Sequence, residues 1–191
     1  MNDFTIGGIQ PPHLAFYSEC VRFNCEAALK SVENVASFIQ MSNESKGNYE
    51  MTGELQNEIL DNIQNILTYA AALSRYFWPS RNGKEEIHLK RGQVLRDMFK
   101  VDDNSPLKNR KLRNQLEHLD ENLDQYLSSK PIVGVILPSY VGGMHEDDGV
   151  PLHLFRAYYI DVGLFEVLGQ RYEVQPLVDE IFYVYNHFNE K

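Results

Sequence analysis

Residues 14–39, LAFYSECVRFNCEAALKSVENVASFI, decide the fold class because their apolar positions recur every three or four residues. The stripe consists of Leu14, Tyr17, Val21, Cys25, Ala28, Val32, Val35 and Ile39. This spacing puts these side chains on one face of an α-helix, so it predicts a long amphipathic helix. Both Cys20 and Cys25 lie in it and are interpreted as small core residues rather than redox groups.

Two further helices are predicted before residue 100. The first has an apolar stripe that consists of Leu55, Ile59, Ile63, Ile66, Ala70, Leu73 and Phe77. Pro79 ends this helix, because proline cannot continue a helical hydrogen-bond ladder. The polar stretch Ser42–Gly53 before it is predicted as a loop, and Ser80–Lys84 after it as a turn. A shorter helix is predicted from about Leu89 to Phe99.

A fourth helix is predicted to begin at Pro106, with Ser105 as its N-cap, and to end before Pro131. Its apolar face consists of Leu112, Leu116, Leu119, Leu123 and Tyr126. Beyond it the pattern changes from helix to strand. The β-branched run Ile132–Leu137 predicts one strand.

The rest of the chain predicts a hairpin and a closing helix. The segments 153–160 and 164–168 flank a turn at 161–163 and have the pattern of paired strands. The closing helix has Leu177, Ile181, Val184 and Phe188 on one face. Together the segments predict a mainly α protein: a helical bundle with a small appended antiparallel β element and a C-terminal helix. Its 191 residues fit a single domain, 1–191, with the bundle over 14–130 and the β-hairpin and closing helix over 131–191.

Charge is distributed unevenly along this acidic chain, whose formal net charge is −9. Ten of the 18 Lys and Arg residues, against five acids, fall in residues 80–113. Such a basic neighbourhood can attract a polyanion, although solvated helix faces are the simpler interpretation. The N-terminus has no basic region followed by an apolar core, and no stretch approaches a membrane span. A cytoplasmic protein without membrane partners is therefore expected.

The segment Arg113-Asn-Gln-Leu-Glu-His118 is the strongest candidate site. On an ideal helix Asn114 and His118 lie one above the other, opposite the apolar stripe, and Arg113 flanks that stripe. His118 is therefore expected to face solvent or a second molecule. RNA cleavage needs a base for the 2′-hydroxyl, a cation for the phosphorane and an acid for the leaving 5′-oxygen. Histidine and arginine suit these tasks, and a two-fold dimer would bring two of each together.

This Arg-Asn-x-x-x-His motif on the polar face of a late helix resembles the HEPN superfamily over about residues 14–130. The resemblance implies a metal-independent endoribonuclease of a toxin–antitoxin, phage-defence or CRISPR-linked system, with its site composed across a homodimer. It implies that Arg113 binds phosphate, that His118 is the acid/base and that Asn114 orients the site. It further implies an RNA substrate and a possible antitoxin or inhibitor protein, and it calls for no cofactor and no metal.

Other interpretations remain open. The same fold can be a non-catalytic interaction or dimerisation module, with Arg113 and Glu117 paired on a salt-bridged surface helix. Glu117, Asp120, Glu121 and Asp124 would repel a phosphate there. A looser copy of the motif, Arg81-Asn82 with His88, spans an Asn-Gly turn and has the wrong geometry.

Two further features can be interpreted as ordinary structure. The loop His145-Glu-Asp-Asp148, with His153, has metal-ligand residue types but no established spacing. The aromatic residues of the C-terminal region could stack on RNA, although their periodicity favours packing. They are Tyr158, Tyr159, Phe165, Phe182, Tyr183, Tyr185 and Phe188.

Overall fold

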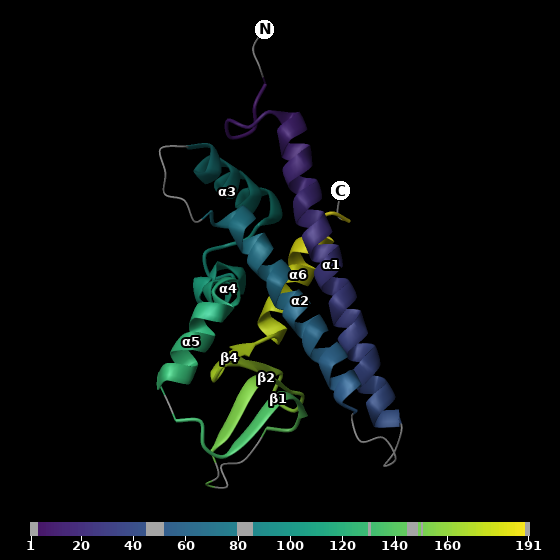
Figure 1. Cartoon of the computed structure of the whole chain (residues 1–191). Helices are drawn as coiled ribbons and strands as arrows, with labels where there is room; N and C mark the ends of the chain where they lie inside the picture. The colour runs from purple at the N-terminus through teal and green to yellow at the C-terminus, as the bar shows by residue number, and fades with distance from the viewer. Residues whose placement is uncertain are drawn as a thin grey trace.

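In the computed structural model, the two longest helices of the described chain pack side by side in antiparallel directions (Figure 1). The structure describes residues 4–44, 52–79, 86–129, 131–144, 149 and 151–189. The helices are α1 (Pro11–Glu44), α2 (Gly53–Phe77), α3 (Glu86–Phe99), α4 (Arg110–Glu117), α5 (Leu119–Ser129) and α6 (Gln175–Asn186), with a 3₁₀ turn η1 (Pro106–Lys108). The strands are β1 (Val135–Gly142), β2 (Leu152–Tyr159), β3 (Leu164–Val167) and β4 (Gln170–Glu173). The chain is therefore mainly helical, with one small sheet.

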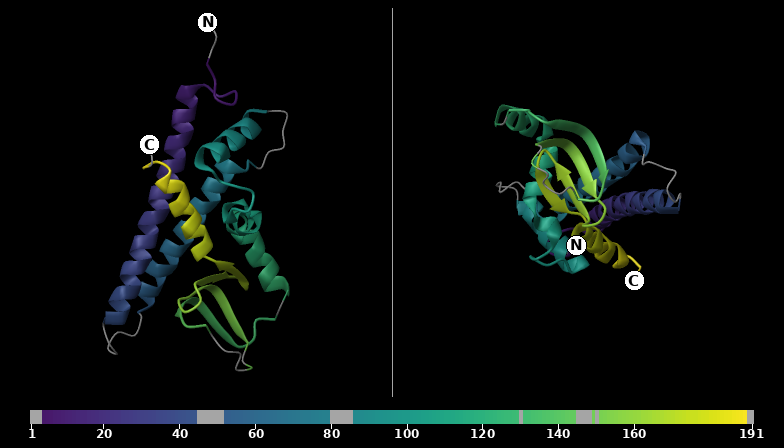
Figure 2. Two further views of the ribbon diagram at one scale, coloured as in Figure 1. Left: turned by 180° about the vertical axis from the view of Figure 1, so that it is seen from behind. Right: turned by 90° about the horizontal axis from the view of Figure 1, so that it is seen from below.

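The predicted stripes of the first two helices form the core between them. Val21, Cys25 and Ala28 of α1 are fully buried, as are Ile59 and Leu73 of α2. The side chain of Thr52 caps α2 by accepting a hydrogen bond from the Leu55 N–H. The helix ends at Phe77, two residues before Pro79, as predicted. From behind, α6 lies against α1 and closes the bundle (Figure 2).

The fourth predicted helix is wrong in one respect, because the structure divides it into η1, α4 and α5. Ser105 caps η1 by accepting from the Leu107 N–H, whereas Asn109 caps α4 by accepting from the Lys111 N–H. The described part of its apolar face packs inward as predicted, and the side chain of Leu112 lies outside the described residues. The residues of that face packed against the core are Leu116, Leu119, Leu123 and Tyr126.

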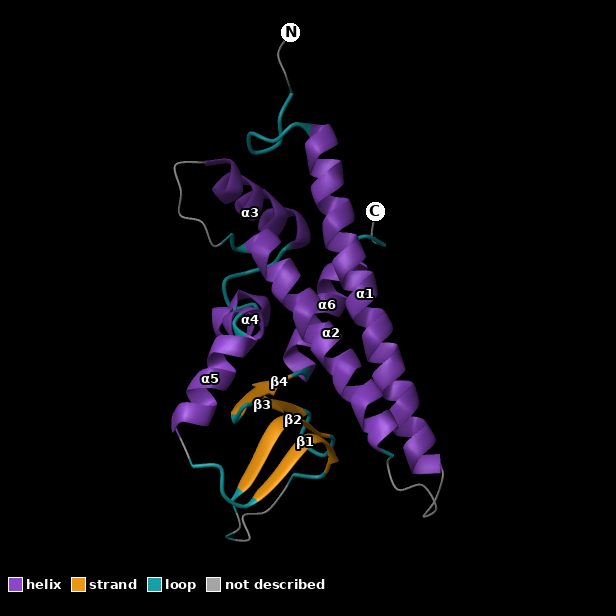
Figure 3. Ribbon diagram, viewed as in Figure 1, coloured by secondary structure: helices purple, strands orange, loops and turns teal. Residues whose placement is uncertain are grey.

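The sheet is mixed rather than antiparallel, which corrects the prediction. Its strand order is β1-β2-β3-β4, and β1 runs parallel to β2 (Figure 3). The predicted hairpin is confirmed as β2 and β3, and β4 pairs antiparallel with β3. Apolar spacing identifies strands but carries no information about their relative direction, so the parallel pair was not predictable from it.

The first strand also begins later than predicted. Gly134 has φ +108°, a conformation outside the strand region, so the run Ile132–Leu137 is interrupted and β1 begins at Val135. The strand then continues through Pro138 to Gly142. Proline lacks the N–H that a central strand requires, and β1 is an edge strand of the four-stranded sheet, where it is tolerated.

One apolar core extends from the helices into the sheet. Val141, Phe165 and Val167 belong to the same buried cluster as the stripes of α1 and α2. Polar contacts supplement it, because Arg156 of β2 forms an ion pair with Asp61 of α2. One face of the sheet therefore packs against the helices and forms part of the same core.

Burial of Cys25 has a consequence at alkaline pH. Desolvation, with a smaller contribution from Glu26, raises the pKa of this thiol from 9.0 to about 12. Below pH 9 the thiol is protonated in both the folded and the unfolded chain, so its stabilising contribution is complete. Between pH 9 and about 12 only the unfolded chain loses this proton, so the free energy of unfolding falls as the pH rises.

We therefore expect Cys25→Ala to have a flatter stability profile than the wild type above pH 9. The difference in slope should approach about 1.4 kcal/mol per pH unit, the value for one proton. Urea unfolding at pH 8, 9 and 10 measures it. Loss of the buried sulfur atom also lowers the free energy of unfolding of the variant at every pH, so the slopes of the two profiles are compared rather than their absolute values. Parallel profiles for the two proteins would contradict the prediction.

Candidate functional site

The candidate site lies on α4 and at its junction with α5. Arg113 and Asn114 occupy the middle of α4, and His118 is its C-cap residue. Asn114 is exposed, and the side chain of His118 is 55 % exposed. The prediction that His118 points away from the core is therefore confirmed. The side chain of Arg113 lies outside the described part of the chain, so this arginine is placed on α4 by its backbone.

The chain bends at His118, where the prediction had a continuous helix. Its φ of −122° and ψ of 40° are not helical, although its N–H still donates to the Asn114 carbonyl. Figure 1 shows α4 end-on and α5 running away from it toward the sheet. The Asn122 side chain donates to the Gln115 carbonyl at 3.3 Å, so it satisfies an acceptor near the end of α4. The bend places His118 at an exposed corner of the chain, defined here as the junction between the end of α4 and the start of α5.

The imidazole of His118 has a carboxylate beside it. Its Nδ1 lies 3.5 Å from Oε2 of Glu121, one turn further along the chain, and both side chains are exposed. A protonated Nδ1 would form an ion pair with this carboxylate. An exposed imidazole is a side chain that can serve in proton transfer.

Arg75 is a residue of this neighbourhood that sequence reasoning missed. It lies in the last turn of α2 and forms an ion pair with Glu117, the residue immediately before His118. The alternative interpretation paired Glu117 with Arg113, whose side chain lies outside the described residues. No sequence pattern marks the Arg75–Glu117 pair, because the two residues are 42 positions apart and meet only when α4 packs on α2.

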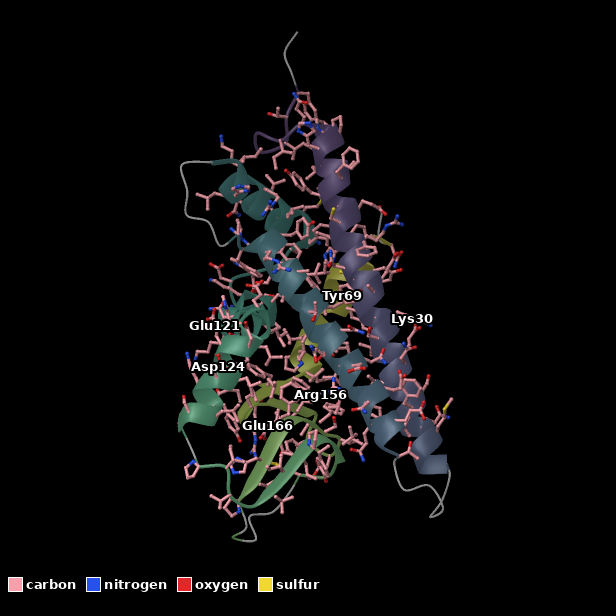
Figure 4. All side chains as sticks on the ribbon, viewed as in Figure 1. Lys30, Tyr69, Glu121, Asp124, Arg156 and Glu166 are labelled. Carbon is pink, nitrogen blue, oxygen red and sulfur yellow. The ribbon has the colours of Figure 1, made fainter. Side chains whose placement is uncertain are left out.

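Three further carboxylates surround the corner. Asp120, Glu121 and Asp124 are all exposed on α5. Figure 4 shows Glu121 and Asp124 on the side of α5 that faces away from α2. The acidic character that the sequence predicts for this face is therefore present, and it opposes the approach of a phosphate.

Several cations of the basic segment have structural roles. Arg91 donates to the Arg75 carbonyl at 3.0 Å and lies over the rings of Tyr17 and Tyr76. Arg96 donates to the Phe77 carbonyl. These two arginines satisfy carbonyls at the C-terminal end of α2, where the helix dipole also favours positive charge. Their guanidinium groups therefore contribute less to an RNA-attracting surface than the sequence count indicates.

The lysines next to α4 differ in their surroundings. Lys108 pairs with Asp103 at 2.9 Å, while Lys111 is exposed in the first turn of α4. A positive charge in that turn lies on the same short helix as Asn114. Of the described cations in residues 80–113, Arg91, Arg96 and Lys108 are therefore engaged in contacts within the protein.

His153 is a structural histidine rather than a metal ligand. It is buried, its Nδ1 lies 2.9 Å from the hydroxyl of Tyr126, and its Nε2 lies 3.1 Å from the Val133 carbonyl. A carbonyl only accepts, so Nε2 carries a proton and links β2 to the segment before β1. No group of three His, Cys, Asp or Glu side chains in the described part of the chain is arranged to hold a metal ion. The predicted candidates at 145–148 and at Arg81-Asn82 lie outside the described residues.

The aromatic residues of the C-terminal region mostly pack. Phe165 and Tyr159 are buried, whereas Phe182 and Tyr183 of α6 are exposed. Burial, together with the charge of Glu166, raises the pKa of Tyr159 to about 12. Glu166 is itself buried, accepts from the Tyr159 hydroxyl and pairs with Arg171 at 2.7 Å. This sheet cluster satisfies its own polar atoms and therefore has a structural role.

Comparison with known proteins identifies no relative: no family model, curated protein or solved structure matches the chain. None of the helices in the described ranges has the length and apolar character required to cross a bilayer.

Proposed function

We propose that this chain is a metal-independent endoribonuclease of HEPN type that acts in a toxin or phage-defence system. The observation that carries the proposal is the exposure of His118 at the corner of α4, one helical turn after Asn114 and close in sequence to Arg113. Leu116 of the same helix packs against the core, which supports a solvent-facing orientation of the polar face that carries Asn114. The helical character of the chain up to α5 is consistent with a HEPN-like bundle.

The proposed reaction needs proton transfer at two oxygens. The 2′-oxygen of one nucleotide attacks the adjacent phosphorus as its proton passes to an imidazole. The P–O5′ bond breaks, and the departing 5′-oxygen takes a proton from a second imidazole. The products are a 2′,3′-cyclic phosphate and a 5′-hydroxyl. Arg113 binds the phosphate and stabilises its developing charge, and Asn114 orients the site.

One chain provides half of this machinery, so the active species is a homodimer. A two-fold axis near α4 brings together two copies of Arg113 and two of His118, one imidazole acting as base and the other as acid. An exposed histidine at a corner of the fold suits such a shared site. An antitoxin or inhibitor protein would act by covering this surface or by preventing dimerisation.

RNA cleavage in EDTA tests the proposal. Purified wild-type protein should cleave RNA under these conditions and leave cyclic phosphate ends, while His118→Ala should cleave at a greatly reduced rate. Mixed dimers test the shared site: after subunit exchange, a 1:1 mixture of the two proteins retains about a quarter of the wild-type activity, the fraction of dimers with two intact subunits. Retention of half the activity would indicate independent sites in each copy.

A non-catalytic dimerisation module is the second candidate. The specific observation in its favour is the acidic surround of His118, formed by Glu117, Asp120, Glu121 and Asp124. Absence of cleavage by the wild type, on both structured and single-stranded RNAs, would favour this module over the nuclease.

A further inference from the structure

A groove lies between α1 and α6, which pack against each other (Figure 2). It is open to solvent and has a volume of about 480 Å³. Its apolar lining consists of Leu29, Val32 and Ala36 of α1 and of Phe182 and Tyr185 of α6. The described lining residues all belong to these two helices, so the groove is separate from the candidate site on α4.

Phe182 is exposed in this groove although its helix has a well-packed apolar face. Leu177, Val178, Ile181 and Val184 of α6 are buried, whereas Phe182 is 48 % exposed. Burial of an exposed phenylalanine is favourable because it removes a large apolar surface from water. Phe182 is therefore the side chain around which a partner molecule would pack.

The length of the groove suits a helix. Its lining on α1 extends from Glu26 to Ala36, which is about 15 Å along the helix axis, or about three turns. The furrow between two packed helices can be filled by the side chains of a third helix. A partner helix of about three turns, with apolar residues at i, i+3, i+4 and i+7, matches this length. An amphipathic helix is therefore the occupant whose shape fits.

The rim of the groove is acidic. Glu26 and Glu33 of α1 belong to its lining, and Asp179 is exposed on α6 one helical turn before the apolar lining residue of that helix. The amine of Lys30, also in the lining, lies 3.6 Å from Glu33. The next cation along α1, Arg22, already pairs with an acid at 2.7 Å. The remaining negative charge favours a basic partner and opposes an acidic polypeptide or an anionic membrane surface.

We propose that the groove between α1 and α6 is a docking site for a basic amphipathic helix of a partner protein. The apolar stripe of that helix covers Phe182 and Tyr185, and its Lys and Arg residues lie beside Glu26 and Glu33. An apolar centre with a charged rim is the usual anatomy of a protein–protein contact. The inference does not depend on the proposed ribonuclease activity, because no described residue of α4 or α5 lines the groove.

The test uses the full chain and two synthetic helical peptides of about 15 residues. Both have leucines at i, i+3, i+4 and i+7, and their polar positions are lysine in one peptide and glutamate in the other. Calorimetric titration should show that the lysine peptide binds at least about tenfold more tightly than the glutamate peptide. Phe182→Ser should weaken binding of the lysine peptide about tenfold, because the apolar anchor is lost. Glu26→Gln/Glu33→Gln should weaken it about fivefold and reduce its dependence on salt.

Matched controls are available outside the groove. Phe16→Ser removes an exposed phenylalanine of α1 that does not belong to the described lining. Glu54→Gln/Glu58→Gln removes two exposed carboxylates of α2 and changes the net charge by the same amount. Both control proteins should bind the lysine peptide like the wild type. All the replaced side chains are exposed, so the melting temperatures of the variants should agree within a few degrees.

Several results would overturn the inference. They are failure of the lysine peptide to bind, equal affinity for the two peptides, and undiminished binding by Phe182→Ser. Sedimentation of the chain alone adds another: self-association that Phe182→Ser abolishes would show that a second copy covers the groove instead of a partner protein. RNA cleavage in EDTA is measured in parallel, and Phe182→Ser should cleave at the wild-type rate. An inactive wild type that binds the lysine peptide as expected would overturn the proposed function and leave this inference standing.

Discussion

Replacement of His118 with alanine should lower the rate of RNA cleavage in EDTA by about a hundredfold to ten-thousandfold, the usual contribution of general acid–base catalysis. The effect is large because each composite site would lose both its base and its acid in one substitution. His118 is exposed and its side chain contacts only Glu121 among the described polar partners, so the fold should persist. Gel-resolved cleavage of a labelled RNA measures the rate, and circular dichroism checks the fold.

The matched control for this variant is His13→Ala. His13 is an exposed histidine near the start of α1 and belongs to no candidate site. The His13→Ala variant should cleave RNA at the wild-type rate. Equal cleavage by wild type and His118→Ala would indicate a contaminant or a different site, and the assignment of His118 would then be wrong.

The largest expected effect on stability is that of Gly134→Ala. A Cβ atom at this position would lie 2.1 Å from the backbone carbonyl oxygen of Pro151, and the φ of Gly134 is +108°. The same oxygen accepts from the Val135 N–H, so it cannot move away without breaking the first hydrogen bond between β1 and the segment before β2. We expect a loss of about 3 kcal/mol or more, measured by urea unfolding, from backbone strain and displacement of β1.

Gly163→Ala separates the conformational cost from the steric one. Gly163 also has a positive φ, +66°, but a Cβ atom added there would meet no described atom within 4 Å. It should lose only about 1 kcal/mol, the cost of a left-handed conformation for a residue with a side chain. Equal losses of unfolding free energy in the two variants would show that the steric contact with Pro151 adds nothing to the cost of the substitution at Gly134.

Part of the candidate site follows from local periodicity. The helical wheel predicted that Asn114 and His118 lie opposite the apolar stripe, and both are exposed. The prediction held because an i, i+4 relationship survives up to the C-cap, where the His118 N–H still reaches the Asn114 carbonyl. Beyond His118 the wheel no longer applies, since the chain bends there.

The remaining features of the site depend on contacts between distant segments. Arg75 contacts Glu117 because α4 packs on α2. Arg91 and Arg96 donate hydrogen bonds to backbone carbonyls at the C-terminal end of α2. Charge counts along the chain treat all cations alike. They do not distinguish an arginine that satisfies a helix end from one that is available to RNA.

The sequence by itself determined the long helices α1 and α2, the closing helix α6 and the β2–β3 hairpin. Their apolar residues repeat with the period of the element, and a proline or a turn marks an end, so local information suffices. Only the tertiary structure decided the bend at His118, the parallel pairing of β1 with β2 and the ion pair of Arg75 with Glu117. Each of these depends on where a segment packs after the chain has folded, which short-range periodicity does not encode.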